Sequence, residues 1–203
     1  MGRYTGPKHK LSRREGVDLF GNGGESLERR LSQPPGMHGQ SATFRRQRRG
    51  DYEPQLREKQ KVKRTYGLRE KQFRRFYRLA QQTRALTGPT LLSLLERRLD
   101  NVVFRMGWAR TRPQARQFVS HGHILIDGQT IDIPSYLVAP NQGLTLKPRT
   151  QRIPEIQELI DAPVSVPEWL ARDGATGQVL RVPGREDIAE DFDEQLVVEF
   201  YSR

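Results

Sequence analysis

The sequence LERRLDNVVFRMG occupies residues 95–107, and TRPQARQFVSHGHILIDGQTIDIP follows at residues 111–134. From Leu91 to Met106 the apolar residues recur at steps of three and four, with charged residues between them, which is typical of an amphipathic helix. Pro89 suits the first turn of that helix, and Gly107 suits the left-handed residue that ends it. We therefore expect one continuous helix before residue 107.

A second, shorter helix is predicted directly afterwards. Thr111 and Gln114 have the spacing of a capping box, and Gly122 suits the end of the helix. The apolar face of this helix consists of Ala115, Phe118 and Val119. Its polar face and the residues after it form a basic edge without carboxylates: Arg110, Arg112, Arg116, Gln117, His121 and His123.

A β-hairpin is predicted after this helix. The Asp-Gly pair at residues 127–128 favours the two-residue turn that joins antiparallel strands. The turn places Ile124 opposite Ile131, and the residues expected on one face of the hairpin are Ile124, Ile126, Ile131 and Ile133. A strand near residues 144–147 closes a small sheet.

These motifs resemble the RNA-binding module named after the fourth protein of the bacterial small ribosomal subunit. Further stretches are similar to that ribosomal protein family itself: GRYTGPKHKLSRREGVDLF from Gly2, PPGMHGQ from Pro34, DYEPQLREKQKVKRTYG from Asp51 and the terminal VVEFYSR. The similarity spans nearly the whole chain in the family's own order. The chain is therefore identified as similar to this family in its cysteine-free form.

The resemblance implies an α+β fold. A module of two helices and a small antiparallel sheet is inserted, in sequence, within a basic helical N-terminal domain. We expect a basic arm and short helices over residues 1–50, a basic helical region over 51–86, the module over 87–150 and an acidic α+β segment over 151–203.

Charge is distributed unevenly along the chain, whose net charge is +11. The first 86 residues hold 22 Lys and Arg against eight Asp and Glu, whereas residues 151–203 hold five against 12. Of the 35 cations 28 are arginine, the side chain that best binds phosphate in a forked geometry. This composition points to an anionic polymer as the partner.

The expected RNA-binding side chains lie mostly in the first 86 residues. Residues 2–10 read as an extended arm and residues 11–20 as a short helix, and a run of arginines lies between Phe44 and Tyr52. A helix opened by Pro54 carries so many cations that little face remains for a core, so it needs a polyanion. Outside the module the candidates are Arg3, Lys8, Lys10, Arg13, Arg14, Arg45, Arg46, Arg48, Arg49, Arg57, Lys59, Lys61, Lys63, Lys71 and Arg74.

The helix expected over residues 69–83 has Phe73, Phe76, Tyr77 and Ala80 at the spacing of a core-facing side. The last residues, from Gln195, read as a strand. Acidic residues before it suit a basic protein neighbour better than RNA, and the expected protein contacts are Glu190, Asp191, Asp193 and Glu194.

No catalytic residue, metal site or cofactor is expected. The chain has no cysteine, and His9 and His38 are too few for a tetrahedral site. His121 and His123 have the spacing of a ligand pair, but without a third ligand nearby an RNA-contacting or structural role is favoured. No apolar run is long enough to span a membrane, so a cytoplasmic protein is expected.

The resemblance implies a structural constituent of the small ribosomal subunit that binds small-subunit ribosomal RNA at a multi-helix junction, nucleates assembly of the subunit body and, with small-subunit protein five, influences translational accuracy. Further partners are other small-subunit proteins and mRNA where it enters the subunit. Two alternatives remain: a free-standing RNA chaperone or regulator, or an accessory of an RNA-modifying enzyme.

Overall fold

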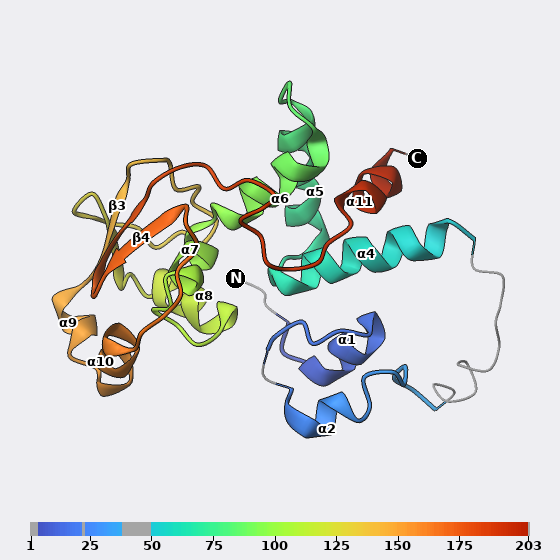
Figure 1. Ribbon diagram of the computed structural model, residues 1–203, viewed down its shortest axis with the longest axis horizontal. Coiled ribbons are helices and arrows are strands. Elements are labelled where there is room, and N and C mark those ends of the chain that lie inside the picture. The colour runs from blue at the N-terminus through green and yellow to red at the C-terminus, as the bar shows by residue number, and fades with distance from the viewer. Residues whose placement is uncertain (1–3, 22, 38–49, 203) are drawn as a thin grey trace. The chain divides into compact units, whose positions relative to one another are not determined.

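The computed structural model describes residues 4–21, 23–37 and 50–202, and the chain divides into two compact units. Unit 1 is built from the described residues of Met1–Gln81 and Asp191–Arg203, and unit 2 is Gln82–Glu190. The chain leaves unit 1, forms unit 2 and returns. This arrangement confirms the α+β class and the insertion of the module within a helical domain; Figure 1 shows the elements of both units.

Unit 1 is helical in its described part. Its helices are α1 (Lys8–Glu15), α2 (Gly24–Glu28), α4 (Tyr52–Thr65), α5 (Glu70–Gln81) and α11 (Glu194–Tyr201). α1 begins within the stretch expected as an extended arm and ends early, at Gly16, whose φ of 72° is left-handed. The predicted apolar side of α5 is confirmed as buried.

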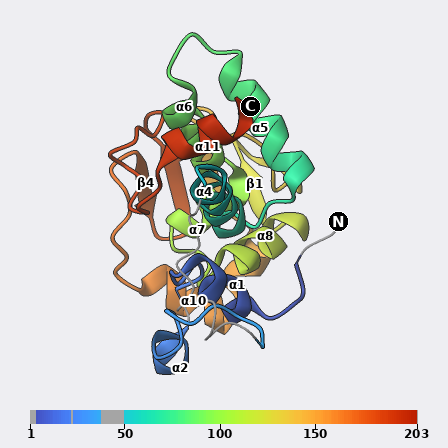
Figure 2. The same cartoon turned by 90° about the vertical axis from the view of Figure 1, so that its right-hand side faces the viewer.

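The last residues form the helix α11, so the expected strand is wrong. Asp193 begins the helix, because its Oδ1 accepts hydrogen bonds from the backbone nitrogens of Gln195 and Leu196 at 3.1 and 3.2 Å. Val197 is buried, and Tyr201 follows one turn later on the same side. Figures 1 and 2 show α11 alongside α4.

α4 has a packed side, contrary to the expectation that it needs a polyanion. Val62 is fully buried on it, and even Lys59 is only 4% exposed. Lys59 Nζ donates to Glu70 Oε2 at 3.0 Å and lies 4.5 Å from the ring centroid of Phe200. Carboxylates and aromatic rings of unit 1 therefore take the place that sequence analysis assigned to an anionic ligand.

Unit 2 begins with two helices where one was expected, α6 (Thr87–Glu96) and α7 (Leu99–Arg105). The break lies at Arg98, which is extended, with φ −63° and ψ 137°. A segment distant in sequence binds the backbone there: Leu99 N donates to the carbonyl of Tyr136 at 2.8 Å, and Val138 N donates to that of Arg97 at 2.9 Å. These non-local bonds replace helical ones and explain the break.

The helix α8 (Arg112–Ser120) and the hairpin follow as predicted. Thr111 Oγ1 accepts from Gln114 N at 3.3 Å, while Gln114 Oε1 accepts from Arg110 N at 2.8 Å. The turn at residues 127–128 has φ values of 48° and 83°, as its type requires. Ile133 was expected on the buried face, but it is 55% exposed because β2 ends at Thr130.

The sheet of unit 2 has five antiparallel strands in the order β2-β1-β3-β5-β4. They are β1 (Ile124–Ile126), β2 (Gln129–Thr130), β3 (Gly143–Leu146), β4 (Leu170–Asp173) and β5 (Thr176–Val179). The helices α9 (Pro148–Gln151) and α10 (Pro154–Asp161) lie between β3 and β4 in sequence. Residues 151–190 thus share a unit, and with Ile156, Trp169 and Val179 a core, with the module.

Candidate nucleic-acid interface

α5 carries a row of cations opposite its buried side. Lys71, Arg74, Arg75 and Arg78 are exposed and recur at the spacing of one helical face. Within the described part of the chain, none of these four side chains has a carboxylate within ion-pair distance. We call these four residues the α5 face. Lys71 and Arg74 were expected from the sequence to bind RNA, whereas Arg75 and Arg78 were not, although the same spacing identifies them.

The cations of α4 are used within unit 1. Lys63 Nζ donates to Glu70 Oε2 at 2.9 Å, and Lys59, one turn earlier in α4, donates to the same oxygen. Tyr201 donates to the other carboxylate oxygen of Glu70 at 2.6 Å. Burial alone would raise the pKa of Glu70, but these three hydrogen bonds hold it at about 2. The other three α4 cations also lie near carboxylates: Lys61 is 3.3 Å from Glu58, Arg57 is 3.5 Å from Glu15, and Arg64 pairs with Glu15 as well.

The first helix supplies a smaller exposed group. Lys10 and Arg14 are exposed, and Lys8 lies 5.6 Å from the ring centroid of Phe20. Arg13 instead donates to the carbonyls of Gln33 and Pro34 at 3.0 and 3.3 Å. The remaining candidates of this region, Arg3, Arg45, Arg46, Arg48 and Arg49, lie outside the described residues.

The two arginines of α8 are held by carboxylates of unit 2. Arg112 donates Nη2 to Glu190 at 2.5 Å and Nε to Asn101 at 2.9 Å. Arg116 donates Nη1 to Asp100 at 3.0 Å. Their side chains are only 16% and 18% exposed. These arginines therefore contribute to packing between helices as well as to the basic edge, and replacing them would change stability too.

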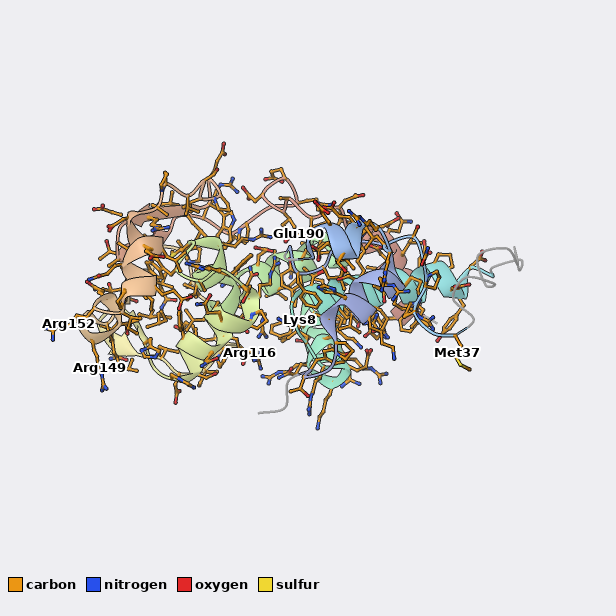
Figure 3. All side chains as sticks on the ribbon, turned by 90° about the horizontal axis from the view of Figure 1, so that it is seen from below. Lys8, Met37, Arg116, Arg149, Arg152 and Glu190 are labelled. Atoms are coloured by element: carbon orange, nitrogen blue, oxygen red, sulfur yellow. The ribbon has the colours of Figure 1, made fainter. Side chains whose placement is uncertain are left out.

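A second group of basic residues lies where α8 ends and α9 begins. His121 and His123 have ring centroids 6.0 Å apart, and His123 Nδ1 is 2.8 Å from Thr150 Oγ1. Burial, with the charges of His121, Lys147 and Arg149, lowers the pKa of His123. We call His121, His123, Lys147 and Arg149 the module end. Figure 3 shows Arg149, and Arg152 beyond it, projecting outward.

The histidines of the module end were expected from the sequence, but Lys147 and Arg149 were not. The segment KPRTQR, from Lys147, was the available signal. It lies more than 20 residues after His123 in sequence, and the structure brings the two together because Lys147 N donates to the carbonyl of His123 at 3.0 Å. Of the other module candidates, Gln117 is exposed, and Arg110 forms an exposed pair with Glu158 at 3.2 Å.

The four acidic residues expected to contact a protein have separate surroundings. Glu190 binds two arginines of unit 2, and Asp193 caps α11. The backbone carbonyl of Asp191 accepts from Lys61 at 2.5 Å, and Glu194 lies in the first turn of α11. Glu190, Asp191 and Asp193 thus take part in contacts within the chain.

In the part of the chain that the structure describes, no three His, Asp or Glu side chains gather where they could hold a metal ion. None of the helices described there is long and apolar enough to cross a membrane.

Acid is expected to weaken unit 2 through Glu190. Burial alone would raise the pKa of this carboxyl, but Arg105 and Arg112 hold it at about 2, below the ordinary 4.5. Its contribution to the free energy of unfolding is therefore complete above pH 4.5 and is lost as the pH falls toward 2, by up to about 3 kcal/mol. Urea unfolding followed by tryptophan fluorescence measures this free energy, since Trp108 and Trp169 both lie in unit 2.

Glu190→Gln is the matched variant for this measurement. It should be less stable than the unchanged protein at neutral pH, and the difference should shrink on acidification. A difference that stays constant between about pH 6 and pH 2.5 would contradict the assignment.

The exposed cationic faces and the inserted α+β unit together define a basic protein of the nucleic-acid-binding class. Two family models match: ribosomal protein S4/S9 N-terminal domain over residues 3–96, and S4 domain over residues 97–144. Small ribosomal subunit protein uS4 of Herpetosiphon aurantiacus is 52% identical, and those of Chloroflexus aurantiacus and Salinibacter ruber are 48% and 47% identical, each over the whole of both chains. The chain belongs to the uS4 family. This is a family of structural RNA-binding proteins, so the chain is not an enzyme.

Proposed function

We propose that this protein is a structural component of the small ribosomal subunit in the cytoplasm and binds small-subunit ribosomal RNA through two cationic surfaces. The α5 face carries the proposal, because four exposed cations at helical spacing have no carboxylate of the described chain to neutralise them. Each phosphate that they neutralise releases counterions, which favours binding. The module end supplies the second surface.

The two surfaces suit recognition of RNA shape. Phosphate contacts fix the position of a protein on RNA, and A-form helices hide their base edges in a deep groove. Two such surfaces on two units allow one chain to bind more than one RNA segment, as a junction of several helices requires. The protein would in this way stabilise a junction early in assembly and nucleate the body of the subunit.

The finer partners belong to the same proposal. Small-subunit protein five is the expected protein neighbour, with an influence on translational accuracy, and other small-subunit proteins and mRNA where it enters the subunit are further partners. Glu194 and the exposed Asp191 and Asp193 remain the candidate contacts for a basic neighbour. Crosslinking of assembled subunits that placed protein five only on residues 1–81 would remove this part.

Sedimentation tests the proposed function. The tagged protein, expressed in cells in place of the resident one, should sediment in a one-to-one ratio with small subunits and with their assembly precursors. A protein that stays in the light fractions, or that associates substoichiometrically, would instead be a free RNA chaperone or regulator.

The module end yields a prediction of its own. Replacing Lys147 and Arg149 together by Gln should weaken binding to small-subunit rRNA by about tenfold or more and flatten the log–log salt slope by about 1.4–1.8. Arg149 is exposed and Lys147 is half-buried, and neither side chain forms part of the core, so thermal unfolding should change little. The pair Arg29→Gln and Arg181→Gln removes the same charge elsewhere and should leave the slope unchanged. Equal effects from both pairs would show that net charge, not this surface, determines binding.

A further inference from the structure

Glu190 closes a ring of hydrogen-bonded side chains over α8. Its Oε1 accepts from Arg112 and its Oε2 from Arg105, each at 2.5 Å. Arg105 also donates to both oxygens of the fully buried Glu96, at 2.8 and 2.9 Å. Asn101 completes the ring, donating to Glu96 at 2.8 Å and accepting from Arg112 at 2.9 Å.

The carboxylate in this ring occupies a position that suits a phosphate. Two guanidiniums converge on its two oxygens, which is the geometry in which arginines also bind phosphate oxygens. The Arg112 guanidinium is fixed in place over the ring of Phe104, 4.6 Å from the centroid. For an RNA phosphate that approaches Arg112, the binding position is therefore already formed but is occupied by the carboxylate of Glu190.

Two other carboxylates from residues 151–190 also contact residues in α8 or just before it. Glu158 pairs with Arg110 just before α8, and Glu155 accepts from Gln114 at 3.3 Å. The sequence of unit 2 accordingly contains 13 Lys and Arg against 12 Asp and Glu. The arginines near α8 are thus neutralised within unit 2, in contrast to the α5 face.

We propose that Glu190 is an internal competitor of RNA: it holds Arg112 in the unbound protein, stabilises unit 2, and lowers the affinity for RNA by the work of displacing it. The inference rests on the proposed RNA-binding function. It assigns Glu190 a role in setting affinity, and it predicts that removing this carboxylate improves binding while it weakens the fold.

The test compares Glu190→Gln with the unchanged protein on small-subunit rRNA. Its Kd should be about three- to tenfold lower at low salt, with a salt slope steeper by about 0.7–0.9, the value of one added phosphate contact. Its Tm, followed by tryptophan fluorescence, should fall by up to about 10–15 °C. Glu168→Gln is the control, because it removes the same charge from a side chain that is 93% exposed and should change Kd less than about twofold.

A second variant assigns the gain to Arg112. In the background of Arg112→Gln, Glu190→Gln should no longer tighten binding. Should Glu190→Gln fail to fold, Glu190→Asp replaces it, since its shorter carboxylate cannot span both arginines, and it should bind about twofold tighter.

Folded Glu190→Gln that binds as tightly as the unchanged protein, or more weakly, overturns the inference. So does an equal gain in Glu168→Gln. Neither result bears on the proposed function, which is tested separately by rRNA binding of the unchanged protein and by its sedimentation with small subunits.

Discussion

Replacing Arg74, Arg75 and Arg78 together by Gln is expected to weaken binding to small-subunit rRNA by about 100- to 1,000-fold near 0.1 M salt. Each arginine of the α5 face neutralises one phosphate in our account, so the log–log salt slope should become shallower by about 2–3. The fold should be retained, because these side chains are exposed while Phe73, Phe76 and Tyr77 form the opposite, buried side.

The control for this variant removes three exposed arginines elsewhere: Arg29, Arg30 and Arg181. Arg29 and Arg181 have their own carboxylate partners, Glu25 at 2.9 Å and Asp187 at 2.5 Å. We expect at most a few-fold weakening from the control. A control as weak in binding as the α5 variant would mean that only the total charge of the protein matters.

A chain that ends at Glu190 is expected to lose the fold of unit 1 while unit 2 stays folded. It lacks the buried Phe192 and Val197, together with Tyr201, whose ring lies 4.5 Å from that of Tyr77. Each buried side chain of this size contributes about 1.5–3 kcal/mol, and a domain has only about 5–15 kcal/mol in total. Glu70 would also lose its hydrogen bond from Tyr201 and would keep only those from Lys59 and Lys63.

Two probes separate the units in this truncation. Far-UV circular dichroism should lose helix and proteolysis should cut within α4 and α5, whereas the tryptophan fluorescence of unit 2 should still report a cooperative transition. A chain that ends at Tyr201 serves as the control and should behave as the full chain does. Protection of α4 and α5 in the shorter chain would contradict the role given to α11.

Local patterns predicted the elements whose signals lie within a few residues of one another. The cap at Thr111, the turn at residues 127–128 and the helical spacing of the apolar side of α5 are signals of this kind, and all are confirmed. The break at Arg98 is different, because it depends on hydrogen bonds from residues about 40 positions later.

A strand was expected at the position of α11 for a related reason. LVVEFY is rich in β-branched and aromatic residues, which favours a strand by propensity. Yet Val197 and Tyr201 are four residues apart, and the cap at Asp193 precedes them, so the helical alternative was also present in the sequence. The helix forms and the strand does not, because the helix packs its apolar side against α4.

The sequence predicts which residue types form the candidate site, but not which of them pair with carboxylates. Helical spacing identifies the α5 face from sequence alone. Which arginines face a carboxylate is a tertiary property, so the pairing of Arg112 with Glu190 could not be foreseen. The negative charge of residues 151–203 and the positive charge of the earlier segments are separated in sequence, but in unit 2 they are brought together.

The salt dependence of rRNA binding by the unchanged protein tests the central claim most directly. With the α5 face and the module end engaged, the affinity for small-subunit rRNA should fall with a log–log slope of about −4 to −6. An affinity that barely changes between low and high salt, or no binding at low salt, would contradict the account.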